Sequence, residues 1–190
     1  MCPQAAMSAK KSVAEIVAVS ADGMTLAYTD GEQHGIGLID IRNPAQPKAA
    51  GFLPVEGEPT SVTIAHGKVL AAVNSTQDFA QPTGHLAVFD LARRKALGTC
   101  PLFGQPDSIA LDKGARHAVI VMENERDEKL NKGAIPQLPG GNLTIIPLSA
   151  AGLPDCTRAH PVALNGLAEI ATDDAEPELV KVNAQGIAVV

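Results

Sequence analysis

The sequence predicts an all-β fold, namely a segment of a β-propeller with about three four-stranded blades and the start of a fourth. Two observations predict it: a unit of short strands recurs along the chain, and the composition suits strands joined by turns. Hydrophobic residues make up 45% and charged residues 19% of the 190 residues, with 17 Gly and 14 Pro between them. Four Phe, one Tyr and no Trp exclude a large aromatic core. Such a composition is typical of a globular chain of short strands.

Each unit reads as an alternating strand, a glycine turn, an apolar strand, a polar loop and a further apolar strand. The anchors of the first strands, Val17, Val62, Ile109 and Val180, are 45, 47 and 71 residues apart. This order and spacing are typical of propeller blades of about 40–50 residues. The expected units span 15–53, 59–100, 106–164 and 177–190, after a disordered or linker N-terminus at 1–14.

The elements of the units follow in the same order along the chain. The first strands end at glycine turns, and the expected second and third strands are 24–29 and 37–41, then 69–73 and 86–91, then 117–121 and 143–148. The strand that ends each blade is the least legible, with candidates at 49–53, 96–100 and 159–164. Residues 89–97 read as a strand end followed by a turn, because no helical apolar stripe is present. The fourth unit holds the first two strands of a blade.

The predicted blades do not complete a ring. Closed propellers have about four to eight blades. A chain that stops inside a blade leaves apolar strand edges exposed. We therefore expect a fragment or an open arc that needs further blades or an oligomeric partner.

The charge balance, the lack of long apolar runs and the cysteine spacing disfavour several classes of protein. Lys and Arg number 15 against 21 Asp and Glu, a net charge of −6, which disfavours a basic nucleic-acid binder. No apolar run approaches the roughly 18 residues of a membrane span, and no secretion signal is visible at the N-terminus. Cys2, Cys100 and Cys156 lack metal-type spacing. Cys100 and Cys156 either pair in an oxidising compartment or remain small buried thiols.

Carboxylates recur in loops that propeller geometry places on one rim. The first strand of each unit is innermost, so the loop leading into it and the loop between the second and third strands emerge on the same face. These loops carry Asp30, Glu32, Glu56, Glu58, Asp78, Asp107, Glu123, Glu125, Asp127, Glu128, Asp173, Asp174, Glu176 and Glu178. Gathered carboxylates repel one another unless a cation neutralises them, and oxygen ligands in loops suit Ca²⁺.

We therefore expect a Ca²⁺ site on this rim, where the bound cation would offset phosphate charge and activate water. The candidate metal ligands are Asp30, Glu32, Asp78, Asp107, Glu123 and Glu125. Arg126 and Lys129 are candidates to bind the phosphate of a phosphorylated small molecule, and Asp127 and Glu178 are the candidate catalytic carboxylates. Two alternatives stay open: solvated loops whose charges pair locally, and a rim that binds a protein without metal.

Several stretches occur in an order that resembles secreted bacterial propellers of the choice-of-anchor I type. They are 39–44, 60–67, 106–107, 123–125 and 175–178, and the segment 123–133 resembles a long acidic loop of such proteins. The resemblance covers 15–190 and implies further blades and a periplasmic or extracellular location. It also implies an alkaline-phosphatase-like hydrolase of phosphate esters, related to the esterase-like phytases. The alternative is a non-catalytic propeller scaffold that binds a protein or glycan partner.

Overall fold

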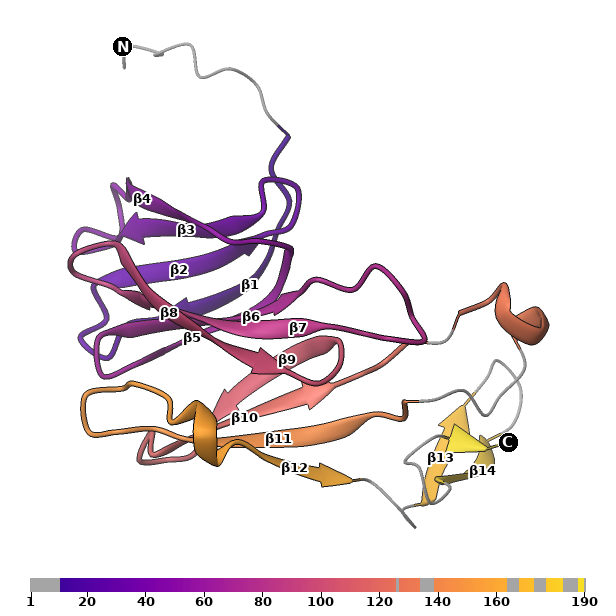
Figure 1. Cartoon of the computed structure of the whole chain (residues 1–190). Helices are drawn as coiled ribbons and strands as arrows, with labels where there is room; N and C mark the ends of the chain where they lie inside the picture. Colours follow the sequence, from indigo (N-terminus) through magenta and orange to yellow (C-terminus); the bar gives the residue numbers. More distant parts are fainter. Residues whose placement is uncertain are drawn as a thin grey trace.

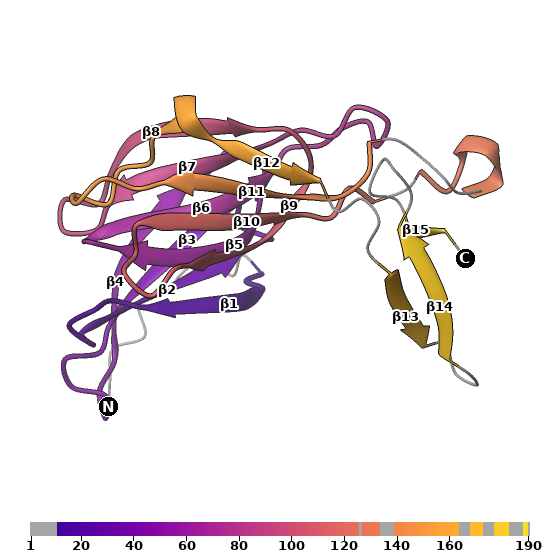
Figure 2. The ribbon, with the colours of Figure 1, turned by 90° about the horizontal axis from the view of Figure 1, so that it is seen from below.

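Three four-stranded antiparallel sheets, stacked face to face, make up most of the molecule (Figures 1 and 2). The computed structural model describes residues 11–125, 127–133, 139–163, 168–172, 177–182 and 188–189, the last three ranges by their backbone. Each of the three sheets has its strands in sequence order. This is the arrangement of propeller blades, and the expected all-β propeller segment is confirmed.

The strands of the three blades have the following bounds. Blade 1 contains β1 (Ala14–Val19), β2 (Thr25–Asp30), β3 (Gly35–Asp40) and β4 (Lys48–Pro54). Blade 2 contains β5 (Glu58–Ala65), β6 (Lys68–Asn74), β7 (Gly84–Asp90) and β8 (Lys95–Leu102). Blade 3 contains β9 (Pro106–Leu111), β10 (His117–Met122), β11 (Asn142–Pro147) and β12 (His160–Ala163), with short 3₁₀ helices η1 (Leu130–Gly133) and η2 (Cys156–Arg158) in its loops.

A fourth sheet contains one strand more than the sequence indicated. It consists of β13 (Ala168–Thr172), β14 (Pro177–Val182) and β15 (Ala188–Val189) in that order. The strands β14 and β15 fall where the start of a fourth blade was expected. The strand β13 was missed, although the turn signal Asn165-Gly166 stands just before it in the sequence and Ile170 lies within it.

Local chemistry accounts for the tight turns. His66 and Gly67 both have positive φ, 46° and 74°, and connect β5 to β6 as a two-residue hairpin of the kind that matches strand twist. After β7, the Asp90 side chain accepts a hydrogen bond from Arg93 N at 2.8 Å and Arg94 N donates to Asp90 O at 2.8 Å. These bonds form the turn before β8, so the region 89–97 is a strand end and a turn as expected.

Two apolar layers hold the three blades together. The layer between blades 1 and 2 includes Leu38 and Leu53 on one side and Val69 and Phe89 on the other, all of them buried. The layer between blades 2 and 3 is built from Leu70, Leu86, Ile120, Met122 and Ile146, among others. The first strands β1, β5 and β9 lie next to one another, which places them nearest the propeller axis. Burial of such side chains contributes about 1.5–3 kcal/mol each.

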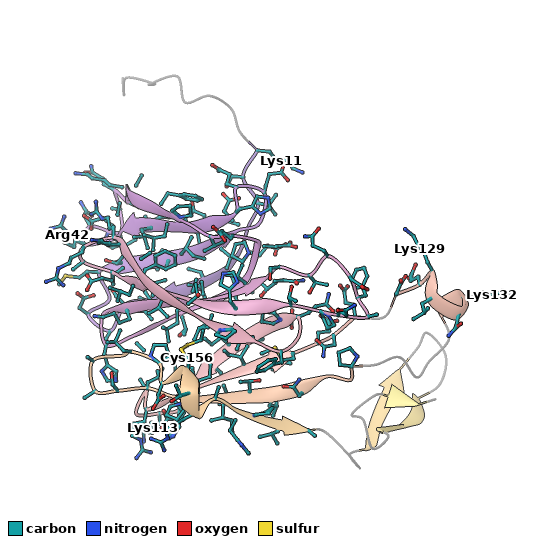
Figure 3. All side chains as sticks on the ribbon, in the orientation of Figure 1. Lys11, Arg42, Lys113, Lys129, Lys132 and Cys156 are labelled. Atoms are coloured by element: carbon teal, nitrogen blue, oxygen red, sulfur yellow. A yellow bond between two sulfur atoms is a disulfide. The ribbon has the colours of Figure 1, made fainter. Side chains whose placement is uncertain are left out.

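A disulfide joins blades 2 and 3 at their outer edges. Cys100 lies on β8 and is fully buried, while Cys156 begins η2 and is exposed. Their sulfurs are bonded, with a Cα–Cα distance of 5.4 Å, which is within the usual range for a disulfide. The sequence left open whether Cys100 and Cys156 pair or remain thiols, and the structure has them as a disulfide. Figure 3 labels Cys156 at η2.

None of the helices in the described part of the chain is long and apolar enough to cross a membrane.

Candidate functional site

The innermost strands β1, β5 and β9 all begin at one rim of the stacked sheets, and an acidic pocket lies there. Its volume is about 240 Å³. Five carboxylates from all three blades line it: Glu15, Glu58, Asp107, Glu123 and Glu125. Thr60, Asn74, Gln105 and Pro106 complete the lining. We call this the acidic pocket, and the end of the sheets that carries it the pocket rim.

Gln105 holds the segment that carries Glu123 and Glu125. The Gln105 backbone carbonyl accepts from Glu123 N at 3.0 Å. Its side chain donates from Nε2 to Glu125 Oε2 at 3.1 Å and accepts through Oε1 from Glu125 N. Gln105 is itself 3% exposed. The loop before β9 therefore fixes where the two glutamates stand.

Asn124 shapes the turn between these two glutamates. It adopts a positive φ of 54°, a conformation that asparagine tolerates better than most residues. Its Oδ1 accepts from Gln105 N at 2.8 Å and its Nδ2 donates to Gly140 O at 2.9 Å. A Cβ at Gly104 would overlap the Asn124 amide, so glycine is needed there.

Like charges act on one another within the acidic pocket. The pKa of Glu123 is raised above its usual 4.5, first by partial burial and then by the negative charges of Asp107 and Glu125. No ion pair joins any of the five pocket carboxylates to a Lys, Arg or His within the described ranges. A cation at this point would relieve the repulsion.

The opposite rim, where β3, β7 and β9 end, has the reverse arrangement. Asp40 pairs with Arg42 at 2.5 Å, Asp90 with Lys68 at 3.5 Å and Arg93 at 3.2 Å, and Asp112 with Arg116 at 3.2 Å. Hydrogen bonds from Arg42 lower the pKa of Asp40 to about 2. Backbone hydrogen bonds, first from His117 and then from Arg116, help to lower the pKa of Asp112 to about 2. Figure 3 shows Arg42 at one end of the molecule and Lys129 at the other.

Three of the six predicted metal ligands, Asp107, Glu123 and Glu125, meet in the acidic pocket. Glu32 lies in an adjoining hollow of about 360 Å³ that shares Glu15 and Glu58 with it. Asp78 lies in a second adjoining hollow of about 670 Å³, which shares Glu125.

The structure does not bring Asp30 into the acidic pocket. Its side chain is fully buried and accepts from Ser12 Oγ at 2.5 Å, Val13 N at 3.1 Å, Gln33 N at 3.1 Å and Gln33 Nε2 at 3.0 Å. Both carboxylate oxygens are therefore used to hold the N-terminal segment against the β2–β3 turn.

The predicted catalytic and phosphate-binding residues are placed only in part. Asp127 and Lys129 line the hollow that contains Asp78 and Glu125, and Lys129 N donates to Asp127 Oδ1 at 2.8 Å. Arg126 and the side chain of Glu178 lie outside the described residues.

Sequence reasoning missed some residues of the pocket. Glu15 was not expected there, although it stands two residues before the anchor Val17, as Asp107 stands two before Ile109. That repeat spacing was a usable signal. No comparable signal marks Gln105 in the sequence, because its role depends on hydrogen bonds across a loop. Glu58 was placed on the rim but not among the ligands.

The donor chemistry of the acidic pocket fits a hard divalent cation, since its lining offers carboxylate and amide oxygens. Within the described residues, however, no group of three His, Cys, Asp or Glu side chains is close enough to hold a metal ion. A cation in this arrangement would take fewer protein ligands with water in the remaining positions, or would draw the carboxylates together.

The choice-of-anchor I domain family matches residues 15–189. No curated protein matches the sequence. Among solved structures, a protein of unknown function from Desulfotomaculum acetoxidans matches 94% of this chain and 50% of its own at 12% identity, with a TM-score of 0.57. The WD40 domain of coronin from Toxoplasma gondii matches 80% of this chain and 34% of its own at 13% identity, with a TM-score of 0.53.

A luciferin-regenerating enzyme matches 65% of this chain and 41% of its own, at 16% identity and a TM-score of 0.48. The chain thus spans half or less of the length of these solved structures. The coronin WD40 domain and the Desulfotomaculum protein share the fold with this chain.

Proposed function

Because the chain belongs to the choice-of-anchor I domain family, we propose that its acidic pocket binds a divalent cation that serves the hydrolysis of phosphate esters. The observation that carries the proposal is the contrast between the two rims. Asp40, Asp90 and Asp112 of the opposite rim each have a basic partner. The five of the acidic pocket have none among the described residues. Keeping them together costs stability, which a bound cation would offset.

The candidate ligands are the pocket carboxylates of blade 3, Asp107, Glu123 and Glu125, with Glu15 of blade 1 and Glu58 of blade 2 beside them. Glu123 and Glu125 are held by Gln105, and Asp107 raises the pKa of Glu123 together with Glu125. Ca²⁺ suits this set because it accepts six to eight oxygen ligands, water included, in flexible geometry.

The residues around Glu125 supply the remaining chemistry in this proposal. A bound cation would polarise a phosphate oxygen and acidify a bound water. Lys129 lines the adjoining hollow and would bind phosphate oxygens from there. Asp127, in the same hollow, would accept the proton of the attacking water. Glu178 and Arg126 keep their proposed catalytic and phosphate-binding roles as predictions.

Export to the periplasm or the cell exterior is part of the proposal. The disulfide between Cys100 and Cys156 supports it, because such bonds persist in oxidising compartments and are rare in the cytosol. The complete site is proposed to need the further blades of a full propeller, since this chain spans at most half of the solved structures it matches.

The alternative, a scaffold that binds a protein or glycan partner, is favoured by one observation. Phe79 is 41% exposed and lines the 670 Å³ hollow beside Gln77 and Asp78. Aromatic side chains beside polar ones are typical of recognition surfaces. A Phe79→Ala variant that lost partner binding while cation binding was absent would support the scaffold.

The test of the proposed activity is hydrolysis of p-nitrophenyl phosphate after chelator treatment and readdition of Ca²⁺. We expect activity only with the cation, and its loss in Glu125→Gln. Asp40→Asn is the matched control, because Asp40 is a carboxylate on the opposite rim with its own arginine. Activity that is unaffected by chelator, or by Glu125→Gln, would contradict the proposal.

A further inference from the structure

Basic side chains gather on the opposite rim of the stacked sheets, although the chain as a whole has a net charge of −6. Antiparallel pairing of consecutive strands brings the loops β1–β2, β3–β4, β5–β6, β7–β8, β9–β10 and β11–β12 to this rim. These loops and the strand residues that flank them contain nine Lys and Arg against five Asp. Figure 3 shows Arg42 and Lys113 at this end of the molecule, away from Lys129 and Lys132. The two rims therefore have opposite charge.

Much of the positive charge on the opposite rim is available to a partner. Within the residues that the structure describes, the ion pairs leave four exposed side chains without a carboxylate partner. They are Lys48, Arg94, Lys95 and Lys113. Arg42, Arg93 and Arg116 are paired, but their side chains stay 72%, 79% and 78% exposed. An anionic partner would therefore meet cations that need not first leave a carboxylate.

Contacts between the loops join the basic groups of three blades into one surface. A Cβ at Gly51 on β4 would lie 3.0 Å from Arg94 Cδ, so this arginine of blade 2 lies against the outer strand of blade 1. His66 Nε2 lies 3.2 Å from Ala115 O, which joins the β5–β6 turn of blade 2 to the β9–β10 turn that carries Lys113. The positive surface thus runs across all three blades.

An exposed apolar turn lies beside these cations. In the β11–β12 loop, hydrogen bonds of 2.9 and 3.1 Å close the turn 149–153. This turn exposes Ala150, Ala151 and Leu153, and Leu153 is 42% exposed. We call these three residues the apolar tip. A Cβ at Gly152 would overlap the carbonyl oxygen that ends β5, so the turn lies against blade 2.

Cations around an apolar tip match the headgroup region of an anionic lipid bilayer. Each Lys or Arg near such a surface contributes about fivefold to the affinity. An exposed aliphatic side chain adds to this when it enters the boundary between headgroups and acyl chains. A soluble acidic polymer would bind the cations but would offer no apolar phase to Leu153. The apolar tip therefore favours a lipid surface as the partner.

We propose that the opposite rim docks on an anionic phospholipid surface, with its exposed cations at the headgroups and Leu153 of the apolar tip inserted among them. Because the overall charge of the chain is negative, only this rim is attracted to such a surface. The acidic pocket, at the other rim, would then face away from the lipid and stay open to solvent. The proposal concerns a surface remote from the acidic pocket and does not depend on the proposed activity.

The test is co-sedimentation of the full chain with phosphatidylcholine vesicles that contain or lack phosphatidylglycerol. A chelator is present throughout, so that no divalent cation bridges the acidic pocket to the lipid. We expect binding only to the vesicles with phosphatidylglycerol, and weaker binding as salt is added. Lys95→Glu/Lys113→Glu should weaken it about 25-fold or more, because two attractive charges are lost. Lys11→Glu/Lys132→Glu changes the net charge equally but away from this rim, and should bind nearly as well as wild type.

Insertion of the apolar tip has its own measurement, because the chain contains no Trp. The single tryptophan of Leu153→Trp should shift its emission to the blue on vesicles with phosphatidylglycerol. Phe103→Trp is the matched control, since Phe103 is 81% exposed in the loop before β9 on the pocket rim, and its emission should not shift. Ala151→Trp is a second reporter in case Leu153→Trp unfolds, which circular dichroism would show.

A soluble polyanion separates lipid docking from simple charge attraction. Leu153→Ser should weaken binding to the vesicles about fivefold or more, while its binding to dextran sulfate stays that of wild type. Equal binding of Leu153→Ser and wild type to the vesicles, with no blue shift in either reporter, would assign the rim to a soluble acidic polymer and overturn the proposal.

Three further results would overturn it. They are a wild type that does not bind the vesicles with phosphatidylglycerol at low salt, equal binding to vesicles of phosphatidylcholine alone, and an equal loss of binding in the two double variants.

Discussion

Replacing Cys156 by Ser should remove the covalent link between blades 2 and 3 without disturbing the packing. Cys156 is exposed, while its partner Cys100 is fully buried in the apolar layer and keeps its place as a thiol. The two cysteines are 56 residues apart, and the bond closes a loop that contains β9, β10 and β11. For a loop of that length, the lost constraint on the unfolded chain lowers the free energy of unfolding by about 4 kcal/mol.

Urea unfolding of the oxidised proteins measures this loss. In thermal unfolding, a chain of this size should show a midpoint lower by about 8–16 °C. Wild type treated with dithiothreitol is the control and should match the Cys156→Ser variant. A loss of less than about 1 kcal/mol, or a further fall when the variant is treated with dithiothreitol, would refute the reasoning.

Three further variants test the electrostatics and packing described above. Burial raises the pKa of Asp30, but hydrogen bonds from Ser12, Val13 and Gln33 outweigh this effect and lower the pKa below 3.8. Asp30→Asn should therefore lower the free energy of unfolding by about 1–3 kcal/mol at pH 7. Urea titrations should show the difference in stability between wild type and variant shrinking as the pH falls from about 3.8 through the native pKa of Asp30. The pKa of Glu123 is raised by burial and by the charges of Asp107 and Glu125. Ionisation of this group therefore lowers the stability of the wild type as the pH rises from 4.5 through the pKa of Glu123 in the native state. Without cation, Glu123→Gln should therefore be more stable than wild type at pH 7, by up to about 1 kcal/mol, and as stable as wild type near pH 4. Equal stability of the two proteins at pH 7 would contradict the proposed repulsion. Gly37→Ala should displace the Tyr28 ring and cost about 1–3 kcal/mol, and fluorescence of the single tyrosine should report the displacement.

The blade architecture was predictable because each strand carries its own signal. Alternation around Val17, Val62 and Ile109 and the glycine turns fix where the chain reverses, and the structure has strands at those places. The strand β13 was missed although Asn165 and Gly166 precede it, because no residue within it repeats the alternation around the other anchors. The disulfide was left open, since a spacing of 56 residues says nothing about proximity without the packing of blade 2 on blade 3.

The sequence predicted that carboxylates gather on one rim, but not which of them line the acidic pocket. Topology was enough to bring Asp107, Glu123 and Glu125 to one end of the sheets. The sequence does not reveal which carboxylates are already hydrogen-bonded. Asp30 was therefore expected to be a metal ligand, although four donors from Ser12, Val13 and Gln33 occupy its carboxylate. The role of Gln105 depends on three hydrogen bonds to a distant loop, which no local pattern encodes.

The most direct test of the cation site is thermal unfolding of chelator-treated protein with and without Ca²⁺. At 100 times its dissociation constant, a ligand stabilises the native state by about 2.7 kcal/mol, or about 5–11 °C for a chain of this length. We expect this shift in wild type and in Asp40→Asn, whose carboxylate lies on the opposite rim. We expect none in Glu58→Gln/Glu125→Gln, which removes two charges from the acidic pocket. A wild type without the shift, or a double variant that retains it, would contradict a cation site in the acidic pocket.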